Sequence, residues 1–281
     1  MKVFAVIPVH NRKNTTLKML SSLAQISRPQ GVDLSVCVID DGSTDGTFEA
    51  IKKAHPEIEV HRSDGNLFWS GAVRLGIDHF LQTDATHLWL LNDDLTLDPH
   101  CLSHMVKAAT QHSSWVVSAT VLDRDDKLLY GGIFKLPFFR FRKATDDDFE
   151  NGVCHADTVN GNCLLISREA LLQFRLPAQG LYRQEALDMY IGLEATRLGK
   201  RPMILRNATC NGEANTTKFW FYAATSPVGN RLRALMGPKG LPPKMYWDFC
   251  RKFAGPLAPF YFVRPYARVL LTPKSKPRAV S

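Results

Sequence analysis

The chain has 281 residues, 45% hydrophobic and 22% charged, with a net charge of +8, a composition typical of a soluble protein with a substantial core. Its six cysteines form no C-x-x-C pair and no dense disulfide pattern, which excludes a disulfide-rich scaffold and predicts free thiols in a reducing compartment. The apolar run at 3–9 is too short for a secretory signal, and no stretch reaches the roughly 18 apolar residues of a transmembrane helix, so we expect a cytoplasmic protein.

The N-terminal third of the chain alternates strand-like and helix-like segments. Short apolar runs predict the strands, and apolar residues at helical spacing predict the helices between them. In chain order we expect strands at 3–7, 34–39, 58–62 and 87–91, and helices at 14–23, 44–54 and 71–80. Strands that alternate with helices predict an α/β fold, in which a Rossmann-like, mostly parallel sheet has helices on both faces.

The middle of the chain, after Pro99, is less regular. We expect helices at 100–112 and 185–198, and strands at 115–121, 163–166 and 202–205. Residues 128–148 mix aromatic, basic and acidic side chains without a period, so we expect an irregular segment there.

The positive charge is concentrated at the C-terminus. Residues 231–281 contain eleven Lys and Arg residues and a single acidic residue, Asp248, and aromatic residues alternate with the bases. Such segments suit an anionic membrane surface. A solvated tail and nucleic-acid binding are the alternatives, and we favour the membrane surface over both. We therefore expect a basic, aromatic, helical extension over 226–281 and no nucleic-acid partner.

Polar residues follow three of the expected strands at the point where each strand ends. Asn11 follows the first, Asp40 and Asp41 the second, and the Asn-Asp-Asp run at 92–94 the fourth. Ligands bind at the carboxyl ends of the strands in open parallel sheets, so these residues predict a binding crevice. The chain has neither G-x-G-x-x-G after the first strand nor a P-loop, which argues against a dinucleotide site and a P-loop nucleotide site.

The adjacent carboxylates of Asp93 and Asp94 follow a strand of bulky apolar residues and cannot both face the core. One can bind Mg²⁺ or Mn²⁺, which take one or two carboxylates together with phosphate oxygens, while the other holds a ribose hydroxyl. A carboxylate at Asp40 or Asp41 can accept a hydrogen bond from a pyrimidine N–H or a ribose hydroxyl. Each run also suits a turn that caps the following helix, so the residues alone leave both interpretations open.

Four segments, taken together, resemble glycosyltransferase family 2, which has the GT-A fold. They are VIPVHN at 6–11, VIDDGSTDGT at 38–47, GNLFWSGAVRLGI at 65–77 and WLLNDD at 89–94, and their order and spacing match over about residues 3–205. The resemblance implies transfer of a sugar from a nucleoside-diphosphate sugar with inversion at the anomeric carbon. The third segment is most similar to bacterial enzymes that build surface polysaccharides, including rhamnosyltransferases.

The resemblance also implies roles for individual residues. Asp94 would hold a Mg²⁺ or Mn²⁺ ion, Asp93 would face the ribose, and Asp41 would contact the base with Asp40 behind it. The remaining residues that the resemblance places around the nucleotide-sugar are Pro8, Val9, Asn11, Asn66, Trp69, Gly71 and Arg74.

Two of these donor contacts have alternatives. Arg74 stands where many relatives have Asn, which leaves its contact with the donor open. Trp69 can instead be an aromatic packing residue at the start of its helix.

The catalytic base is implied by an acidic motif before the late helix. Relatives carry E-D-x-D or a close variant, whereas this chain has Glu185, Ala186 and Asp188 at the corresponding positions. Residues three apart on a helix share a face, so Asp188 or Glu185 can take the proton of an acceptor hydroxyl, and we favour Asp188. The alternative is that both acids only stabilise the positive end of the helix.

These features define the expected organisation and its rivals. We expect one GT-A domain over 1–225, with a nucleotide-binding half at 1–98 and an acceptor half at 99–225, before the basic extension. The acceptor would be a saccharide or a lipid-linked saccharide, and the protein would lie at the inner face of the cell membrane.

A nucleotidyltransferase would need a glycine-rich loop after the first strand, which is absent. A catalytically degenerate, sugar-nucleotide-binding subunit is the other rival, because Ala186 replaces an acid.

Overall fold

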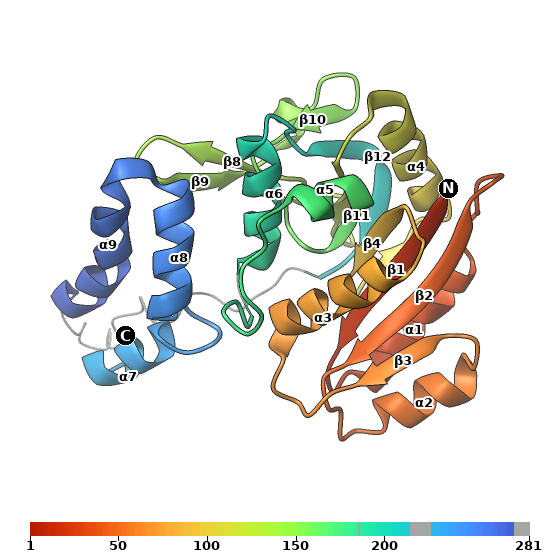
Figure 1. The fold of residues 1–281 in the computed structure, drawn as a ribbon, viewed down its shortest axis with the longest axis horizontal. Coiled ribbons are helices and arrows are strands. Elements are labelled where there is room, and N and C mark those ends of the chain that lie inside the picture. The colour runs from red at the N-terminus through yellow and green to blue at the C-terminus, as the bar shows by residue number, and fades with distance from the viewer. Residues whose placement is uncertain (185, 214–225, 273–281) are drawn as a thin grey trace, which may run out of the picture.

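A computed structural model of the chain describes residues 1–184, 186–213 and 226–272. Helices cover both faces of a large central sheet, which confirms the predicted α/β class (Figure 1). The strands are β1 (Lys2–Val9), β2 (Asp33–Asp40), β3 (Glu59–Arg62), β4 (His87–Leu91), β5 (Thr96–Leu97), β6 (Val116–Leu122), β7 (Leu128–Tyr130), β8 (Ile133–Leu136), β9 (Arg140–Lys143), β10 (Val153–His155), β11 (Cys163–Ser167) and β12 (Met203–Asn211). The helices are α1 (Lys13–Ala24), α2 (Thr47–Ala54), α3 (Phe68–Gln82), α4 (Cys101–His112), α5 (Arg168–Gln173), α6 (Leu187–Arg197), α7 (Val228–Leu235), α8 (Pro243–Phe253) and α9 (Ala258–Leu271).

The four N-terminal strands form a parallel half of the sheet in the order β4-β1-β2-β3. Along β1, Val3, Ala5 and Ile7 pack in one core cluster with residues of α1, α2 and α4, whereas Phe4 and Val6 pack in another with residues of α3 and α6. Both faces of the strand are therefore buried. This double burial explains why its sequence is a continuous apolar run without alternation.

The other half of the sheet is mixed. β11 lies antiparallel between β4 and β6, β12 is parallel to β6, and β10 pairs antiparallel with β12. The connection from β6 to β11 contains short strands and no crossover helix, which lets β11 enter the sheet from the opposite end. The prediction of a mostly parallel sheet therefore describes the N-terminal half better than the whole.

The prediction of an irregular segment at 128–148 is wrong. The segment contains β7, the β8–β9 hairpin and a 3₁₀ turn at Asp146–Asp148. In the hairpin, the Arg142 guanidinium lies 4.3 Å from the centre of the Phe134 ring, and the Phe139 ring packs 5.4 Å from that of Tyr261 in α9. Only Ile133 of β8 and no residue of β9 is buried, so these strands lack the continuous apolar run that reveals the central strands in the sequence.

Two helices begin at least two residues later than the sequence predicts. α2 begins at Thr47 rather than at 44, because the Asp45 side chain accepts the backbone N–H of Thr47 at 3.0 Å and Gly46 has a left-handed φ of 82°. α6 begins at Leu187 rather than at 185, because Ala186 adopts a left-handed φ of 70°. The chain therefore turns sharply just before Asp188.

The C-terminal helices confirm the predicted basic helical extension. α8 packs against α9, with the Trp247 and Phe262 rings 5.4 Å apart, and α7 packs on α9 through Leu235 and Val269. Within 1–184, 186–213 and 226–272, no helix is long and apolar enough to span a bilayer. All six cysteines are buried and unpaired.

Candidate active site

The loops after β1 and β4 meet at the carboxyl edge of the sheet. Arg12, in the first loop, donates from Nη1 to Asp93 Oδ1 at 3.1 Å and to Asp94 Oδ2 at 2.9 Å. Thr16 of α1 donates to the other oxygen of Asp93 at 3.3 Å. A single guanidinium thus holds both acidic residues. Sequence reasoning missed this role, although Arg12 directly follows the predicted Asn11.

The two carboxylates have different environments. Asp93 is 6% exposed, and burial raises the pKa of its carboxyl to about 6, although the charge of Arg12 acts in the opposite direction. The Asp94 side chain keeps 43% of its surface exposed. Mg²⁺ and Mn²⁺ prefer carboxylate oxygens, which both residues supply. The two acids therefore fit the predicted metal, with Asp94 as the ligand that solvent can reach.

Asp41 holds the loop that precedes α3. Its carboxylate accepts hydrogen bonds from Ser63 Oγ at 2.6 Å and from the backbone N–H groups of Leu67 at 3.0 Å and Phe68 at 2.7 Å. These amides would otherwise be unpaired at the helix start, so α3 begins at Phe68 rather than at the predicted 71. The carboxylate can accept a further hydrogen bond, which leaves it available to a ligand. Asp40 is fully buried behind it, and its Oδ2 has no hydrogen-bond partner.

Three further predicted residues lie at the end of β1. Pro8 and Val9 are the last residues of the strand and are buried. Asn11 adopts a left-handed φ of 51°, and its side-chain oxygen accepts the backbone N–H of Thr44 at 2.8 Å. This contact ties the loops after β1 and β2 together at the edge where Asp40 ends β2.

Trp69 links the start of α3 to the end of β4. Its Nε1 donates to Asn92 Oδ1 at 2.9 Å, and Asn92 in turn donates from Nδ2 to Asn162 Oδ1 at 2.8 Å. The edge of the indole lies against Gly161, where an added Cβ would be only 2.3 Å from Trp69 Cη2. The residues just before β11 therefore complete the wall that Trp69 begins.

Asp188 lies on the other side of the same loop. Its Oδ2 accepts the backbone N–H of Gly161 at 2.8 Å, and its Oδ1 accepts that of Met189 at 2.7 Å. Burial of the carboxyl raises the pKa of Asp188, and the two amide hydrogen bonds only partly oppose this rise. The structure thus brings Trp69 and Asp188 together across Gly161. Sequence reasoning missed Gly161, and the only available signal was a glycine between two asparagines at 160–162.

Three other predicted donor contacts bond to neighbouring residues of the chain in this structure. Arg74 pairs with Asp78 one turn further along α3, with Nη2 and Oδ1 3.0 Å apart. Asn66 is exposed, and its carbonyl accepts the Arg183 guanidinium at 3.1 Å. Gly71 is buried, and its N–H donates to the carbonyl of Arg183 at 3.3 Å. Glu185, the alternative base, lies outside the described residues.

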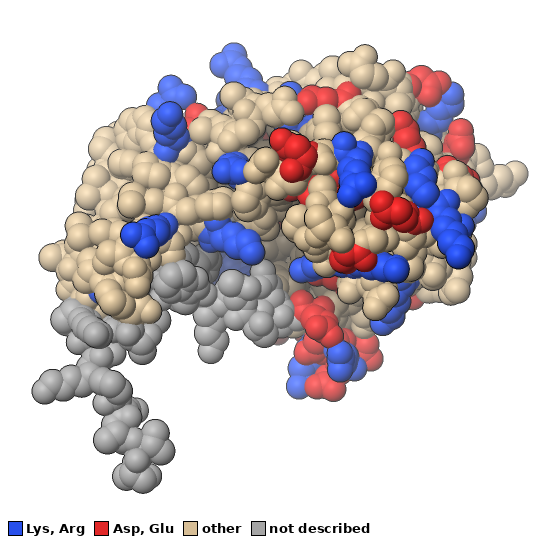
Figure 2. Space-filling model, turned by 90° about the horizontal axis from the view of Figure 1, so that it is seen from below, with Lys and Arg blue, Asp and Glu red and all other residues tan. Residues whose placement is uncertain are grey.

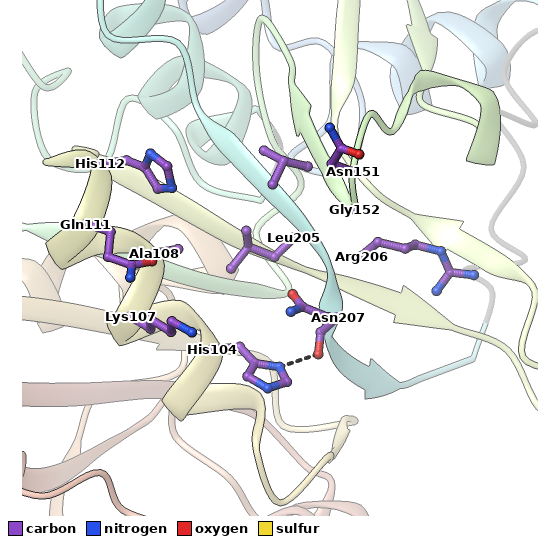
Figure 3. A pocket seen from close by; sticks show the side chains of 11 residues that line it. His104, Lys107, Ala108, Gln111, His112, Asn151, Gly152, Leu205, Arg206 and Asn207 are labelled. Carbon is purple, nitrogen blue, oxygen red and sulfur yellow. Dashed lines mark hydrogen bonds between the residues drawn. The ribbon is translucent and has the colours of Figure 1, made fainter.

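Two cavities lie away from these residues. One of about 480 Å³ opens between α4 and the β10 and β12 strands, and Figure 3 shows its lining, with His104 hydrogen-bonded to the carbonyl of Asn207. The other, of about 570 Å³, lies between α6 and α8 and includes Tyr190 and Lys252. Neither is lined by a predicted site residue. We place the candidate active site at the carboxyl edge of the sheet, where Arg12, Asp93 and Asp94 meet.

Comparisons with known proteins identify the family. The family model described as Glycosyl transferase family 2 matches residues 4–172, more than half of the chain. The chain is also 32% identical over 79 residues to an uncharacterized glycosyltransferase of Mycoplasma genitalium, MG060. That match covers 26% of this chain and 26% of the relative, so it spans only about a quarter of either protein.

Solved structures share the fold at low sequence identity. A mannosyltransferase from Pyrobaculum calidifontis, in complex with GDP-Man and Mn²⁺, superimposes with a TM-score of 0.57 at 15% identity, covering 95% of this chain and 72% of that one. GalNAc-T7 with UDP, GalNAc and Mn²⁺ gives 0.62 at 13% identity, covering 95% and 54%. S. aureus TarS, residues 1–349, gives 0.55 at 15% identity, covering 92% and 73%. These likenesses show the GT-A fold.

Proposed function

Because the chain belongs to glycosyl transferase family 2, we propose that it transfers a sugar from a nucleoside-diphosphate sugar to a hydroxyl acceptor, with inversion at the anomeric carbon. The observation that supports this best is the position of Asp188. Its carboxylate lies against Gly161, which also contacts Trp69 of the proposed donor pocket. A proton acceptor and a donor wall therefore lie side by side.

We assign Asp188 as the general base. The acceptor oxygen attacks the anomeric carbon on the face opposite the nucleoside diphosphate, which leaves as the new bond forms, and the acceptor proton passes to the base. A base acts best when its pKa approaches the working pH, so the raised pKa of Asp188 suits this role. The amides of Gly161 and Met189 hold its oxygens in place. Glu185 is the alternative base.

We assign the donor diphosphate to the edge formed by Arg12, Asp93 and Asp94. Asp94 would hold Mg²⁺ or Mn²⁺, and Asp93, buried behind it, would face the ribose. When bound, such an ion neutralises charge on the leaving diphosphate. Arg12 orients both carboxylates, because its Nη1 contacts each of them near 3 Å. The proposed donor contacts of Pro8, Val9, Asn11, Asp40, Asp41, Asn66, Gly71 and Arg74 complete this half.

We further propose that the acceptor is a saccharide or lipid-linked saccharide of a bacterial cell-surface polysaccharide, with rhamnose as the sugar suggested by the segment at 65–77. The supporting feature is the outer face of α9. Phe260, Val263 and Leu271 are 63%, 54% and 80% exposed and recur at helical spacing, with Arg264 beside them. In Figure 2 the end that holds the C-terminal helices is largely uncharged with scattered basic side chains, whereas most acids lie toward the other end. This face suits the anionic inner surface of the cell membrane.

The donor assignment is tested by a thermal-shift screen of nucleoside diphosphates and nucleotide-sugars, each with and without Mn²⁺. A ligand at 100 times its dissociation constant stabilises a fold by about 2.7 kcal/mol, which is a readable shift. We expect a Mn²⁺-dependent shift with one nucleotide class that is lost in Asp94→Ala and retained in Asp125→Ala, an exposed acid elsewhere. Absence of a shift with every nucleotide would contradict the donor site.

Two features favour a degenerate binding subunit as the second candidate. Ala186 occupies the middle position of the acidic motif, and Arg12 already places a positive charge between Asp93 and Asp94. Such a protein would bind the donor without turning it over. The thermal shift first identifies the donor. Release of the nucleoside diphosphate, measured in the presence of candidate acceptors, then distinguishes the enzyme from the binding subunit. Turnover that is lost in Asp188→Asn supports the enzyme, and tight binding without turnover supports the subunit.

Sedimentation with vesicles tests the membrane face. We expect the protein to sediment with vesicles that contain anionic lipid and not with neutral ones. Added salt should weaken this binding, because it screens the charges of the basic residues. Replacing Phe260 and Leu271 by Ser should release it. Leu172→Ser is the matched control, because Leu172 is also exposed, at 67%, but belongs to α5. Equal sedimentation of both variants would refute the assignment of this face.

A further inference from the structure

Three side chains of types that bind metals lie together at the β3 edge of the sheet, and the proposed reaction uses none of them. Cys37 of β2 is the parallel partner of Glu59 of β3, and His61 lies two residues further along β3. Directly paired residues and alternate positions on a strand point to the same face of a sheet. Cys37 packs in the core cluster with residues of α3, so all three side chains lie on the α3 face.

The ligand atoms of these residues converge. The Cys37 sulfur, a Glu59 carboxylate oxygen and a His61 ring nitrogen all lie within 4.8 Å of one another, and His61 Nε2 is 2.6 Å from Glu59 Oε1. Cys37 is fully buried, whereas the side chains of Glu59 and His61 are 57% and 32% exposed. An ion can therefore enter from the solvent side and meet the sulfur at the bottom of the cluster.

A second histidine limits the movement of the first. The His79 ring of α3 stacks on that of His61, with centroids 3.8 Å apart and planes inclined by 27°. Stacked face to face, the two rings do not point at a common ion, so His79 acts on the orientation of His61. The cluster therefore has an imidazole whose ring plane is held by stacking, a buried sulfur and an exposed carboxylate.

We propose that Cys37, Glu59 and His61 bind a divalent ion of the zinc class, with water in the fourth position. Sulfur, imidazole nitrogen and carboxylate oxygen are the ligands of Zn²⁺, whereas Mg²⁺ and Ca²⁺ prefer oxygen alone. A tetrahedral zinc site places its ligands about 3.5 Å apart. On binding, His61 Nε2 and Glu59 Oε1, which are 2.6 Å apart in this structure, therefore separate by about 1 Å, and both stay within reach of the Cys37 sulfur. The Cys37 thiol releases its proton to solvent as the metal–sulfur bond forms.

The proposed ion joins β3, a four-residue edge strand, to β2. Asp40 ends β2 three residues after Cys37, and Arg62 directly follows His61 and donates to the carbonyl of Ser43 at 2.7 Å. The ion would therefore stabilise the strand pair that carries the β2 end of the donor site. It is separate from the cation proposed at Asp94, which follows β4 on the far side of β1.

Cobalt provides the test, because Co²⁺ bound to a thiolate gives a charge-transfer band in the near-ultraviolet and Co²⁺ bound only to carboxylates does not. We expect the reduced full chain to develop this band with one equivalent of Co²⁺ and to lose it when Zn²⁺ is added. The band should be unchanged in Asp94→Ala, which separates this site from the proposed donor metal. A wild-type protein that takes up Co²⁺ without the band would overturn the proposal.

Variants identify the ligands. Cys37→Ser should abolish the band. Glu59→Gln and His61→Ala should each weaken Co²⁺ binding by at least roughly 10–100-fold, because loss of even a hydrogen-bond partner of a metal ligand has an effect of that size. Cys250→Ser, at another buried thiol, is the control and should keep the band. A band that persists in Cys37→Ser also overturns the proposal. If Cys37→Ser does not fold, the two variants at exposed side chains decide, and unchanged Co²⁺ affinity in both counts against the site.

Discussion

The two acidic centres of the candidate site are built in opposite ways. Asp93 and Asp94 face the guanidinium of Arg12, whereas the carboxylate of Asp188 accepts backbone N–H groups and has no ion-pair partner among the described residues. Burial raises the pKa of both Asp93 and Asp188, but the charge of Arg12 opposes the rise at Asp93, whereas only backbone hydrogen bonds oppose it at Asp188. The same type of side chain therefore suits charge binding at one centre and proton transfer at the other.

The largest expected effect is at Asp188. Asp188→Asn keeps the shape of the side chain and removes the proton acceptor, so we expect kcat to fall by about 10²–10⁴-fold in a sugar-transfer assay. The matched control, Asp125→Asn, changes an exposed acid and should retain activity. A thermal unfolding scan should show that Asp188→Asn is folded. Activity within a few-fold of wild type would transfer the base role to Glu185.

The pH dependence should separate the proton acceptor from general unfolding. Because the pKa of Asp188 is raised, kcat/KM should fall about tenfold per pH unit below a midpoint above the ordinary value of about 4 for Asp. The folded state binds this proton more readily than the unfolded state does. The contribution of Asp188 to the free energy of unfolding therefore increases as pH falls through the same range. We therefore expect activity to fall with pH while Asp188 does not destabilise the folded protein. A midpoint at or below the ordinary value would contradict this prediction.

At the Asp93–Asp94 centre, we expect removal of the Arg12 guanidinium to lower the stability of the fold. Arg12→Gln leaves the nearly buried Asp93 without its positive partner, which should lower the free energy of unfolding by about 1.5–3 kcal/mol in a denaturant titration. Mn²⁺ should recover part of this loss, because it supplies the missing charge. Arg251→Gln removes an exposed pair with Asp248 and should cost at most about 1 kcal/mol. Equal losses in the two variants would argue against a special role for Arg12.

Mutation of Gly161, which lies in the wall between the two centres, is expected to have a smaller effect than the mutations above. In Gly161→Ala the new methyl group would lie 2.3 Å from Trp69 Cη2 and 3.1 Å from Asp188 Cβ, so both must shift. We expect a loss of about 1–3 kcal/mol in the free energy of unfolding, together with reduced kcat/KM. Gly229→Ala is the control, because that position in α7 opens onto free space. A fully active Gly161→Ala variant would show that the wall is not part of the site.

Much of the N-terminal half could be predicted from the sequence. The apolar runs before Asp40 and Asn92 are strands, and the acids after them lie at one edge of the sheet. Buried parallel strands produce continuous apolar runs, so the signal is local and strong. The strand expected at 163–166 is β11, but its antiparallel direction could not be predicted in this way, because its pairing with distant strands decides it. The β8–β9 hairpin could not be predicted either.

The sequence by itself determined which residue types stand at the strand ends and, through its motifs, the family resemblance. Only the tertiary structure decided that Arg12 holds Asp93 and Asp94 across 81 and 82 positions, and that Gly161 lies between Trp69 and Asp188. The reason is physical. Local periodicity records whether a face is buried, whereas the partner of a charged or polar group depends on which loops the folded sheet places side by side.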